Sequence, residues 1–350
     1  MTISTISFSA STNNNALLQH WDAYVESHSE GTIYHLSKWQ KLIQQQFGHN
    51  SFYHYSVNDE NEVNGILPVV QLKSMLFGNY MVSVPYFNYG GAISDEPDIS
   101  NDLMKAAGKI ASRNSSSHVE FRDTQKYEGD WGLREDKVVM LLDLPDDSEK
   151  LWKDIGTKVR AQVKRPQREP VSVKHGGLDL LDDYYEVFAQ NMRDLGTPVY
   201  AKSFFKAILQ TFPENAHIVC VYHNDKPAAA GFLLGYKERM EIPWASALRE
   251  FNKISVNMLL YWEVLKYTIE QGYKQFDFGR STINAGTYRF KKQWGAKPKQ
   301  LYWHYWLAEG QDVPKMNPDN PKYKLVIGLW QKMPVWLTKI IGPSIVKNLP

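Results

Sequence analysis

The order of predicted elements repeats once along the chain, and this repeat limits the possible folds more than any other feature. Two helices, a hairpin, a further strand, a helix and two more strands are predicted in each half. The hairpin turns share Asn-Asp, at 58–59 and 224–225, and the next strands share an apolar-Pro-aromatic sequence, at 84–86 and 242–244. Corresponding landmarks lie about 160 residues apart. We therefore predict an α/β fold of two tandem lobes, each a mixed sheet flanked by helices.

The length of the chain agrees with this division. Its 350 residues suffice for two domains, and we predict an N-terminal lobe at 1–145, a C-terminal lobe at 146–310 and a tail at 311–350. The last strand of each lobe is predicted at 137–144 and 301–308. Lys and Arg number 40 against 38 Asp and Glu, so no strong overall charge favours nucleic acid.

The sequence also carries indications of its cellular location. Its one cysteine, Cys220, cannot form an internal disulfide, which fits a reducing compartment. The N-terminus, which we expect to be flexible over 1–14, lacks the basic and apolar segments of a secretory signal. No apolar run approaches the length of a membrane span. We expect a cytoplasmic protein.

The stretch 274–296 carries the strongest local pattern. Residues 275–278 alternate as a half-buried strand does, Gly279 permits a sharp turn, and Ser281 is one of three possible caps for a short helix. Ligands of open α/β sheets usually bind at such strand-to-helix junctions. Lys291 lies on the predicted helix among aromatic residues, which suggests a functional cation. The alternative interpretation is that this helix only packs on the sheet and that Lys291 faces solvent.

A short basic segment joins the predicted lobes. The stretch 148–168 is predicted to be helical until Pro166 stops it. Residues 158–168 include five basic side chains and no acidic one, and Arg160 and Lys164 share a helix face. With Arg165 they are candidates for binding an anionic donor, such as a nucleotide or the acceptor end of an RNA. A solvated, charged linker is the alternative.

The tail is both basic and apolar. Residues 321–350 contain five lysines and no acid, with two tryptophans and many aliphatic residues. Prolines and Gly342 are expected to break it into short pieces. Such a segment can lie in a membrane interface, but it can equally pack on its own domain or meet a partner. We expect packing ahead of membrane contact.

Two stretches resemble a known family. VKRPQREPVSV at 163–173 and FDFGRSTINAGTYRFKKQWG at 276–295 are similar to the Fem-type (FemAB) aminoacyl and peptidyl transferases, which consist of two GNAT-like acyltransferase lobes. GTPVYAKSFF at 196–205, the FDFGRS turn and NPDNPKY at 317–323 resemble the branch found with exopolysaccharide and protein-sorting (PEP-CTERM) gene clusters. The resemblance covers most of the chain, and the second lobe is its most specific part.

The resemblance implies roles for individual residues. The aromatic-Lys pair Phe290-Lys291 takes the place where the acyl group is transferred, with Lys291 stabilising the oxyanion of the tetrahedral intermediate. Asp123, at the end of the corresponding strand in the first lobe, takes the place of an acceptor-binding Asp. Trp244 takes the place of an aromatic residue that lines the acceptor site. The implied donor is an aminoacyl-tRNA or an acyl-CoA that acts as co-substrate, with no tightly bound cofactor.

The sequence departs from the family at two points. The cell-wall enzymes carry Arg and Tyr near 196–205 for a nucleotide sugar, whereas this chain has Tyr200 and Phe204, so a different acceptor is expected. The glycine-rich loop that cradles a pyrophosphate in acetyl-CoA-using enzymes should fall between 247 and 256, where no glycine occurs. The choice between tRNA and CoA donors therefore stays open.

Other candidates rest on the residues themselves. Arg280 could bind an anion or form a salt bridge, and Ser281 and Tyr288 could contact the substrate or fill structural positions. Asp277 could be a general base, but an Asp in a strand beside a turn more often only caps the helix that follows. The histidines have no metal-binding spacing, so no metal site is predicted.

Together these observations predict an acyltransferase with its chemistry in the second lobe. The acceptor would be a saccharide or amine of the cell envelope or of an exopolysaccharide precursor. The alternative is a non-catalytic Fem-like scaffold of an envelope assembly, held at the inner face of the inner membrane by the tail. We expect a monomer or weak oligomer.

Overall fold

The computed structural model describes residues 2–8, 15–314 and 321–349, and within them the chain forms two compact units. Among the described residues, unit 1 contains 2–8, 15–138, 299–314 and 347–349. Unit 2 contains residues 139–298 and 321–346. Each unit is therefore assembled from separate stretches of sequence. Part of the NPDNPKY motif, at 317–320, lies outside the described residues.

Unit 1 is built on a mixed sheet in the order β1-β2-β3-β4-β6-β15-β7, with β5 beside β3. Its neighbouring strands run antiparallel except for β4 and β6, which are parallel. The strands are β1 (Thr2–Phe8), β2 (Asn50–Val57), β3 (Val63–Ser74), β4 (Gly78–Val82), β5 (Ile93–Ser94), β6 (His118–Asp123), β7 (Gly132–Arg134) and β15 (Tyr302–Leu307).

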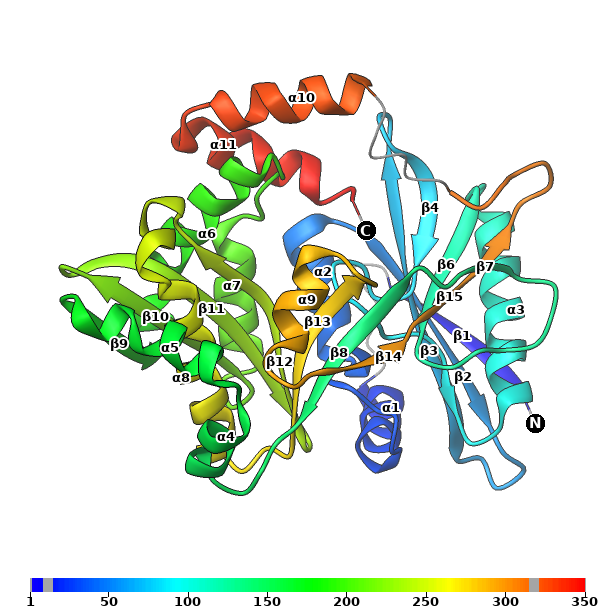
Figure 1. Ribbon diagram of the computed structural model, residues 1–350. Helices are drawn as coiled ribbons and strands as arrows, with labels where there is room; N and C mark the ends of the chain where they lie inside the picture. Colours follow the sequence, from blue (N-terminus) through cyan, green and yellow to red (C-terminus); the bar gives the residue numbers. More distant parts are fainter. Residues whose placement is uncertain (1, 9–14, 315–320, 350) are drawn as a thin grey trace. The chain divides into compact units, whose positions relative to one another are not determined.

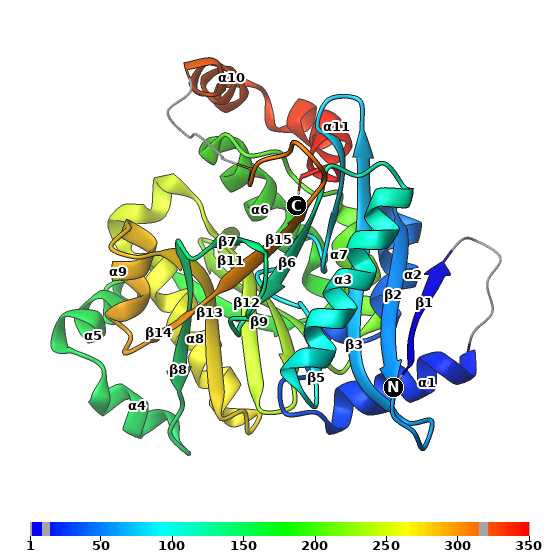
Figure 2. The ribbon, with the colours of Figure 1, turned by 90° about the vertical axis from the view of Figure 1, so that its right-hand side faces the viewer.

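Helices cover both faces of this sheet (Figure 2). One face packs against α3 (Pro97–Arg113), where Phe52, Leu67 and Met81 of the sheet meet Leu103 and Ala107 of the helix. The helix approaches closely at Gly108, because a Cβ there would lie 2.5 Å from Trp306 Cδ1. The other face carries α1 (Asn15–Ser27), η1 (Ile33–His35) and α2 (Lys38–Phe47), with Trp21 of α1 stacked on Tyr53 at 4.7 Å.

Unit 2 is built on a second mixed sheet, in the order β14-β8-β13-β12-β11-β10-β9. The pairs β9–β10, β10–β11 and β11–β12 are antiparallel, and the pair β12–β13 is parallel. The strands are β8 (Lys137–Asp143), β9 (Val171–Gly176), β10 (Ala216–His223), β11 (Lys226–Tyr236), β12 (Arg239–Ala247), β13 (Gln275–Thr282) and β14 (Lys297–Gln300).

Helices again cover both faces (Figure 1). Tyr184 of α6 and Phe205 of α7 each pack at 5.5 Å on Phe232 of β11. On the opposite face Gly231 leaves room for Ile242 and for Leu260 of α8. The helices are α4 (Ser148–Asp154), α5 (Thr157–Lys164), η2 (Pro166–Arg168), η3 (Leu178–Leu180), α6 (Leu181–Leu195), α7 (Lys202–Thr211), η4 (Arg249–Ile254), α8 (Val256–Glu270), α9 (Gly286–Lys292), α10 (Pro321–Lys332) and α11 (Val335–Val346).

The last strands of the two halves are not where the sequence order places them. The strand predicted to end the second lobe, β15, pairs with β6 and β7 in unit 1. The strand predicted to end the first lobe, β8, lies between β13 and β14 in the sheet of unit 2. Both strands form where they were predicted, but the assignment to lobes was wrong. The residue pattern of a strand shows which of its faces is buried. Which strand it pairs with depends on residues far away in the sequence.

Smaller expectations were also corrected. Part of 1–14, expected to be flexible, forms β1. The stretch 81–92 is predicted as a strand followed by a Gly-Gly loop, but the strand ends at Val82, because Val84 and Tyr86 adopt φ of 40° and 77°. Pro343 lies inside α11 and does not end it. Ser37 and Gln40 have the spacing of a capping box for α2, but Ser37 does not cap the helix with its side chain. Its backbone N–H and its hydroxyl instead donate to the Asp22 carboxylate at 2.7 Å.

Candidate functional site

The parallel strands β12 and β13 pair over only a short length. Arg239, Met240 and Glu241 pair in register with Gln275, Phe276 and Asp277. Beyond these positions β12 continues along β11, while β13 continues to Thr282. The backbone groups of β13 past Asp277 therefore need partners other than β12, because buried peptide groups are almost always hydrogen-bonded.

The side chain of Lys291 is the partner of two of these backbone groups. Its Nζ donates to the carbonyl oxygens of Gly279 at 3.0 Å and Arg280 at 2.8 Å. The residue is only 7% exposed. The alternative in which Lys291 lies on a solvated helix face is therefore wrong. Its ammonium is fixed at the point where the two strands part.

Two buried carboxylates lie close enough to influence this cation. Burial lowers the pKa of Lys291 to about 8, while the charges of Asp277 and Glu241 raise it and Arg280 lowers it. Asp277 and Glu241 are register partners on adjacent strands and are 0% and 4% exposed. Sequence reasoning missed Glu241. Its signal was a single acid inside the otherwise apolar first half of a strand, MEIPWASA.

The turn at the end of the strand forms as predicted. Gly279 has φ 76°, and its N–H donates to Asp277 Oδ1 at 2.6 Å. Asp277 thus caps the turn itself, whereas the sequence favoured a cap on the helix that follows. The predicted cap of the next helix differs, since β13 runs through Ser281 to Thr282 and α9 begins at Gly286 after Ala285.

Aromatic packing holds α9 in place. The ring of Phe290 meets Tyr261 of α8 edge to face at 4.9 Å, and Tyr261 stacks on Phe278 of β13 at 5.6 Å. Phe290 thereby fixes the helix that carries Lys291. Ser281 is 3% exposed, and within the described chain its Oγ has no hydrogen-bond partner. Arg280 is exposed and Tyr288 half-buried.

The structure brings two predicted acceptor residues together in unit 2. Tyr200 and Trp244 lie 6.0 Å apart with rings at 67°. Trp244 also meets Phe204 at 5.8 Å and Phe205 at 5.1 Å, edge to face. Both Tyr200 and Trp244 are half-buried, so each keeps part of its ring accessible.

Asp123 lies in unit 1, where both its oxygens are engaged. Oδ1 accepts the N–H of Ala92 at 3.0 Å and Oδ2 lies 2.8 Å from His304 Nδ1. His304 Nε2 accepts the N–H of Tyr127 at 3.1 Å, so the imidazole carries its proton on Nδ1 and donates it to Asp123. The carboxylate is 2% exposed. An acceptor role for Asp123 therefore gains no support from this geometry.

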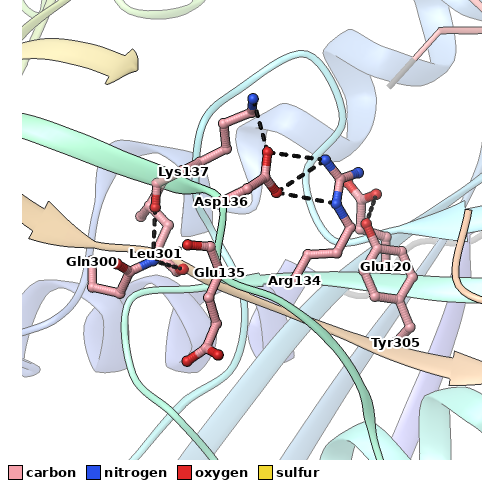
Figure 3. Close-up of polar contacts among 8 residues, drawn as sticks. All are labelled: Glu120, Arg134, Glu135, Asp136, Lys137, Gln300, Leu301 and Tyr305. Carbon is pink, nitrogen blue, oxygen red and sulfur yellow. Dashed lines mark hydrogen bonds and ion pairs between the residues drawn. The ribbon is translucent and has the colours of Figure 1, made fainter. Parts of the chain in front are cut away.

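Unit 1 contains a counterpart of the parting strands, but it is filled. After Val82 and Glu120, where β4 and β6 stop pairing, Ser83 N–H donates to Glu120 O and Ser83 Oγ accepts the N–H of Arg122, each at 2.9 Å. Glu120 is buried and accepts a hydrogen bond from Arg122 Nε at 2.7 Å. It also accepts one from Tyr305 Oη at 2.6 Å (Figure 3). Burial raises the pKa of Glu120, but Arg122 and Tyr305 more than offset this and hold it below its usual value.

The basic segment is largely engaged in local contacts. Arg160 Nη1 donates to the carbonyls of Trp152, Lys153 and Ile155 at the end of α4, at 2.6 to 3.1 Å. Lys164 Nζ lies 5.7 Å from the centre of the Trp152 ring. Arg165 is exposed at the end of α5. Arg160 Nη1 is therefore committed to the end of α4, and Nη2 donates to Thr157 Oγ1 at 3.2 Å.

A family model matches part of the second unit. Residues 157–292 match the family described as "Acetyltransferase (GNAT) domain". The matched segment lies within unit 2 and ends just after Lys291. No curated protein matches the chain.

Solved structures show the fold of the whole chain. FemX matches with 14% identity and a TM-score of 0.64, over 92% of this chain and all of that one. A tandem GNAT protein from the clavulanic acid biosynthesis pathway matches with 12% identity and a TM-score of 0.54, over 89% of this chain and 100% of that one. L-PGS from Bacillus licheniformis matches with 13% identity and a TM-score of 0.52, over 85% and 98%. The predicted fold of two GNAT-like lobes is confirmed.

Proposed function

We propose that unit 2 transfers an activated acyl or aminoacyl group to an amine or hydroxyl of a cell-envelope or exopolysaccharide acceptor. The observation that carries this proposal is the buried ammonium of Lys291 where β12 and β13 part. It lies inside the segment that matches the GNAT domain. A fixed cation in a site of low exposure stabilises developing negative charge far better than a mobile one in water.

The proposed reaction is the transfer of an acyl group from a donor to an acceptor. The acceptor nitrogen or oxygen attacks the donor carbonyl carbon, a new C–N or C–O bond forms, and the carbonyl oxygen becomes an oxyanion. A lysine ammonium has three N–H donors, and among the described residues two of them bind Gly279 and Arg280. The third can donate to the oxyanion. When the tetrahedral intermediate collapses, the bond to the leaving oxygen or sulfur breaks.

Proton transfer needs further groups. We assign the general base to Asp277, which would take the proton released by the acceptor. Oδ1 of this carboxylate also accepts the Gly279 N–H, which fixes its orientation beside Lys291. Tyr288, half-buried on α9, would supply a proton to the leaving group.

The remaining candidates would bind the substrates. Tyr200 and Trp244 offer aromatic faces of the kind on which saccharide rings stack. Arg280 and Ser281, next to the carbonyls that bind Lys291, would contact the reacting group. The donor stays an aminoacyl-tRNA or an acyl-CoA. Lys164 and Arg165 would contribute positive charge toward either one, and Arg160 holds the helix that carries them. Between β12 and α8 the chain has η4 and no glycine, so a CoA pyrophosphate would need an unconventional cradle.

We propose that the protein acts in the cytoplasm at the inner face of the inner membrane, as a monomer or weak oligomer. This location would bring unit 2 to envelope precursors, in keeping with the resemblance to the exopolysaccharide-associated branch. The non-catalytic scaffold remains the competing proposal, and the apolar residues exposed on α10 and α11 favour it as far as docking is concerned.

Donor binding followed by transfer tests the proposal. Acetyl-CoA, longer acyl-CoAs, and charged and uncharged tRNA would be titrated against thermal stability and tryptophan fluorescence, and binding donors would then be offered amine and hydroxyl acceptors. Lys291→Met should lower the transfer rate by roughly a hundredfold or more. The matched control is Lys292→Met, because Lys292 is the next residue of the same helix and is exposed.

The outcomes separate the two proposals. If Lys291→Met and Lys292→Met both turn over at the parent rate, the role assigned to Lys291 is wrong. If no donor binds to the parent protein, the scaffold proposal gains at the expense of the enzyme.

A further inference from the structure

One face of the two C-terminal helices is packed against the rest of unit 2. Trp330 of α10 is 5% exposed, and a Cβ on Gly342 of α11 would lie 2.8 Å from Val199 N. Arg193 Nη1 of α6 donates to the carbonyl of Met333 at 3.0 Å. Both helices contact α6 within unit 2 (Figure 1). The packing expected for the tail is therefore present.

The opposite face is apolar and exposed. Leu325, Val326 and Leu329 of α10 are 66%, 60% and 56% exposed. Trp336 and Ile340 of α11 are 63% and 65% exposed. Residues four apart lie on one side of a helix, so Leu325 and Leu329 form one apolar stripe and Trp336 and Ile340 another. We call these five residues the tail surface.

The charged residues of the two tail helices are all positive. Lys332 and Lys339 are described members of the two helices, and Lys322 and Lys324 precede Leu325 in the sequence. No Asp or Glu occurs from 321 to 350. On the neighbouring helix α6, Asp194 is already paired with Arg193 at 2.7 Å. A partner for this surface should therefore be apolar in its interior and negatively charged at its edge.

We propose that the tail surface docks the protein on an anionic lipid bilayer. Each helix has 12 residues, about 18 Å of helix, which is well short of the hydrocarbon thickness of a bilayer. No helix among the described ranges is long and apolar enough to cross a membrane. Apolar stripes flanked by lysines, with an exposed Trp, are the composition of helices that lie in the interface plane.

This inference gives the proposed membrane location a surface and a lipid class. It needs neither a donor nor an acceptor, so its failure would leave the acyl-transfer proposal untouched. A protein partner or a second copy of the chain would also cover apolar residues. However, neither of them would require a one-signed rim of lysines, whereas anionic headgroups attract one.

Vesicle sedimentation of the full chain tests the proposal. The parent should pellet with phosphatidylcholine vesicles that contain phosphatidylglycerol, and much less with phosphatidylcholine alone. Replacing Leu325, Leu329, Trp336 and Ile340 together by Ser should lower the partition coefficient about tenfold or more. Lys332→Gln with Lys339→Gln should lower it about fivefold or more, only on the anionic vesicles.

The chain offers a matched control for exposed apolar residues. Met75 and Leu76, at the turn between β3 and β4 in unit 1, are 108% and 77% exposed. Met75→Ser with Leu76→Ser should leave the partition coefficient unchanged. Thermal unfolding of every variant checks that the change in binding is not a loss of folding.

Three results would overturn the proposal. The first is a parent protein that does not pellet with anionic vesicles. The second is a tail-surface variant that pellets as well as the Met75/Leu76 control. The third is a parent that self-associates in light scattering and a tail-surface variant that becomes monomeric without any change in lipid binding, because a second copy would then occupy the surface.

Discussion

Each of the two sheets contains a pair of parallel neighbours that separate after a short ladder, and the two pairs differ in the groups that lie beyond the ladder. In unit 1 the strands β4 and β6 are linked past their last pair by Ser83, and the buried Arg122–Glu120 ion pair fills the space beside them. In unit 2 the strand β13 has a lysine ammonium at the same point, bound to two carbonyls. The same supersecondary unit thus serves as a structural core in one copy and as a candidate reaction centre in the other.

The difference is chemical as well as geometric. The Arg122 guanidinium donates to Glu120 Oε1 at 2.7 Å and to Phe87 O at 2.6 Å. Its charge is therefore paired with a carboxylate inside unit 1. The Lys291 ammonium donates to two neutral carbonyls, and the proposed function assigns its third donor to the substrate. A cation that is fully paired stabilises a fold, whereas one with an unused donor can stabilise a charge that appears during a reaction.

The largest effect on stability is expected from Arg122→Met in unit 1. Removing the guanidinium leaves the Glu120 carboxylate buried without its main partner, which should cost about 3–5 kcal/mol of unfolding free energy. Urea unfolding measures the loss. Arg113→Met, at an exposed position, should change it by less than ~0.5 kcal/mol. If Arg122→Met is as stable as the control, the filled strand pair of unit 1 is not a stabilising core.

Tyr305→Phe should produce a smaller loss at the same cluster. The change removes the hydrogen bond from the Tyr305 hydroxyl to Glu120 Oε2 but retains Arg122, so we expect about 1.5–3 kcal/mol. Tyr302→Phe, three residues earlier and half-exposed, is the control. Equal stability of the two variants would show that Arg122 alone satisfies Glu120.

The pH dependence of unit 2 should reveal the strain of the Lys291 site. The folded pKa of Lys291 is about 8, below the ordinary value of 10.5. Between these pH values the unfolded chain binds more protons than the native one, so this group adds stability as pH rises, by about 1–3 kcal/mol. The difference in unfolding free energy between the parent and Lys291→Met, measured from neutral pH to pH 10.5, reports it.

The titration of Lys291 should also appear in the transfer rate, which should change with pH in the opposite direction to stability. Because the oxyanion needs the charged ammonium, the transfer rate should fall as pH rises through about 8, even though the fold becomes more stable. A rate that is constant across this range would mean that the charge of Lys291 is not used.

The smallest effect is expected at the turn after β13. Gly279 has φ 76°, which an L-residue adopts only with strain, so Gly279→Ala should cost about 1–2 kcal/mol. Gly286 in α9 has an ordinary φ and open space around its Cβ position, so Gly286→Ala should be neutral or slightly stabilising. Thermal unfolding of the two variants distinguishes a strained turn from a general intolerance of alanine in this segment.

Local features of this molecule could be predicted from its sequence. Alternation and turn residues indicated most strands, the repeat indicated two lobes, and Gly279 with Asp277 indicated the turn. Long-range features could not be predicted. The burial of Lys291 depends on carbonyls that become available only because β12 and β13 part, and Glu241 matters because strand register places it beside Asp277. Arg160 looked like a free cation because nothing in the sequence shows that α4 ends within its reach.

The return of β15 to unit 1 has a consequence for how this chain folds as it is synthesised. Strand β6 is complete in sequence once residue 123 has been made, but its partner β15 is made only at residues 302–307. Until the ribosome has passed that point, one side of β6 and its whole row of peptide groups lack the partner they have in the native sheet. Unit 1 is therefore finished only after residues 139–298 of unit 2 have been translated. During that interval its open edge is the part of the nascent chain most exposed to aggregation and most dependent on protection by chaperones.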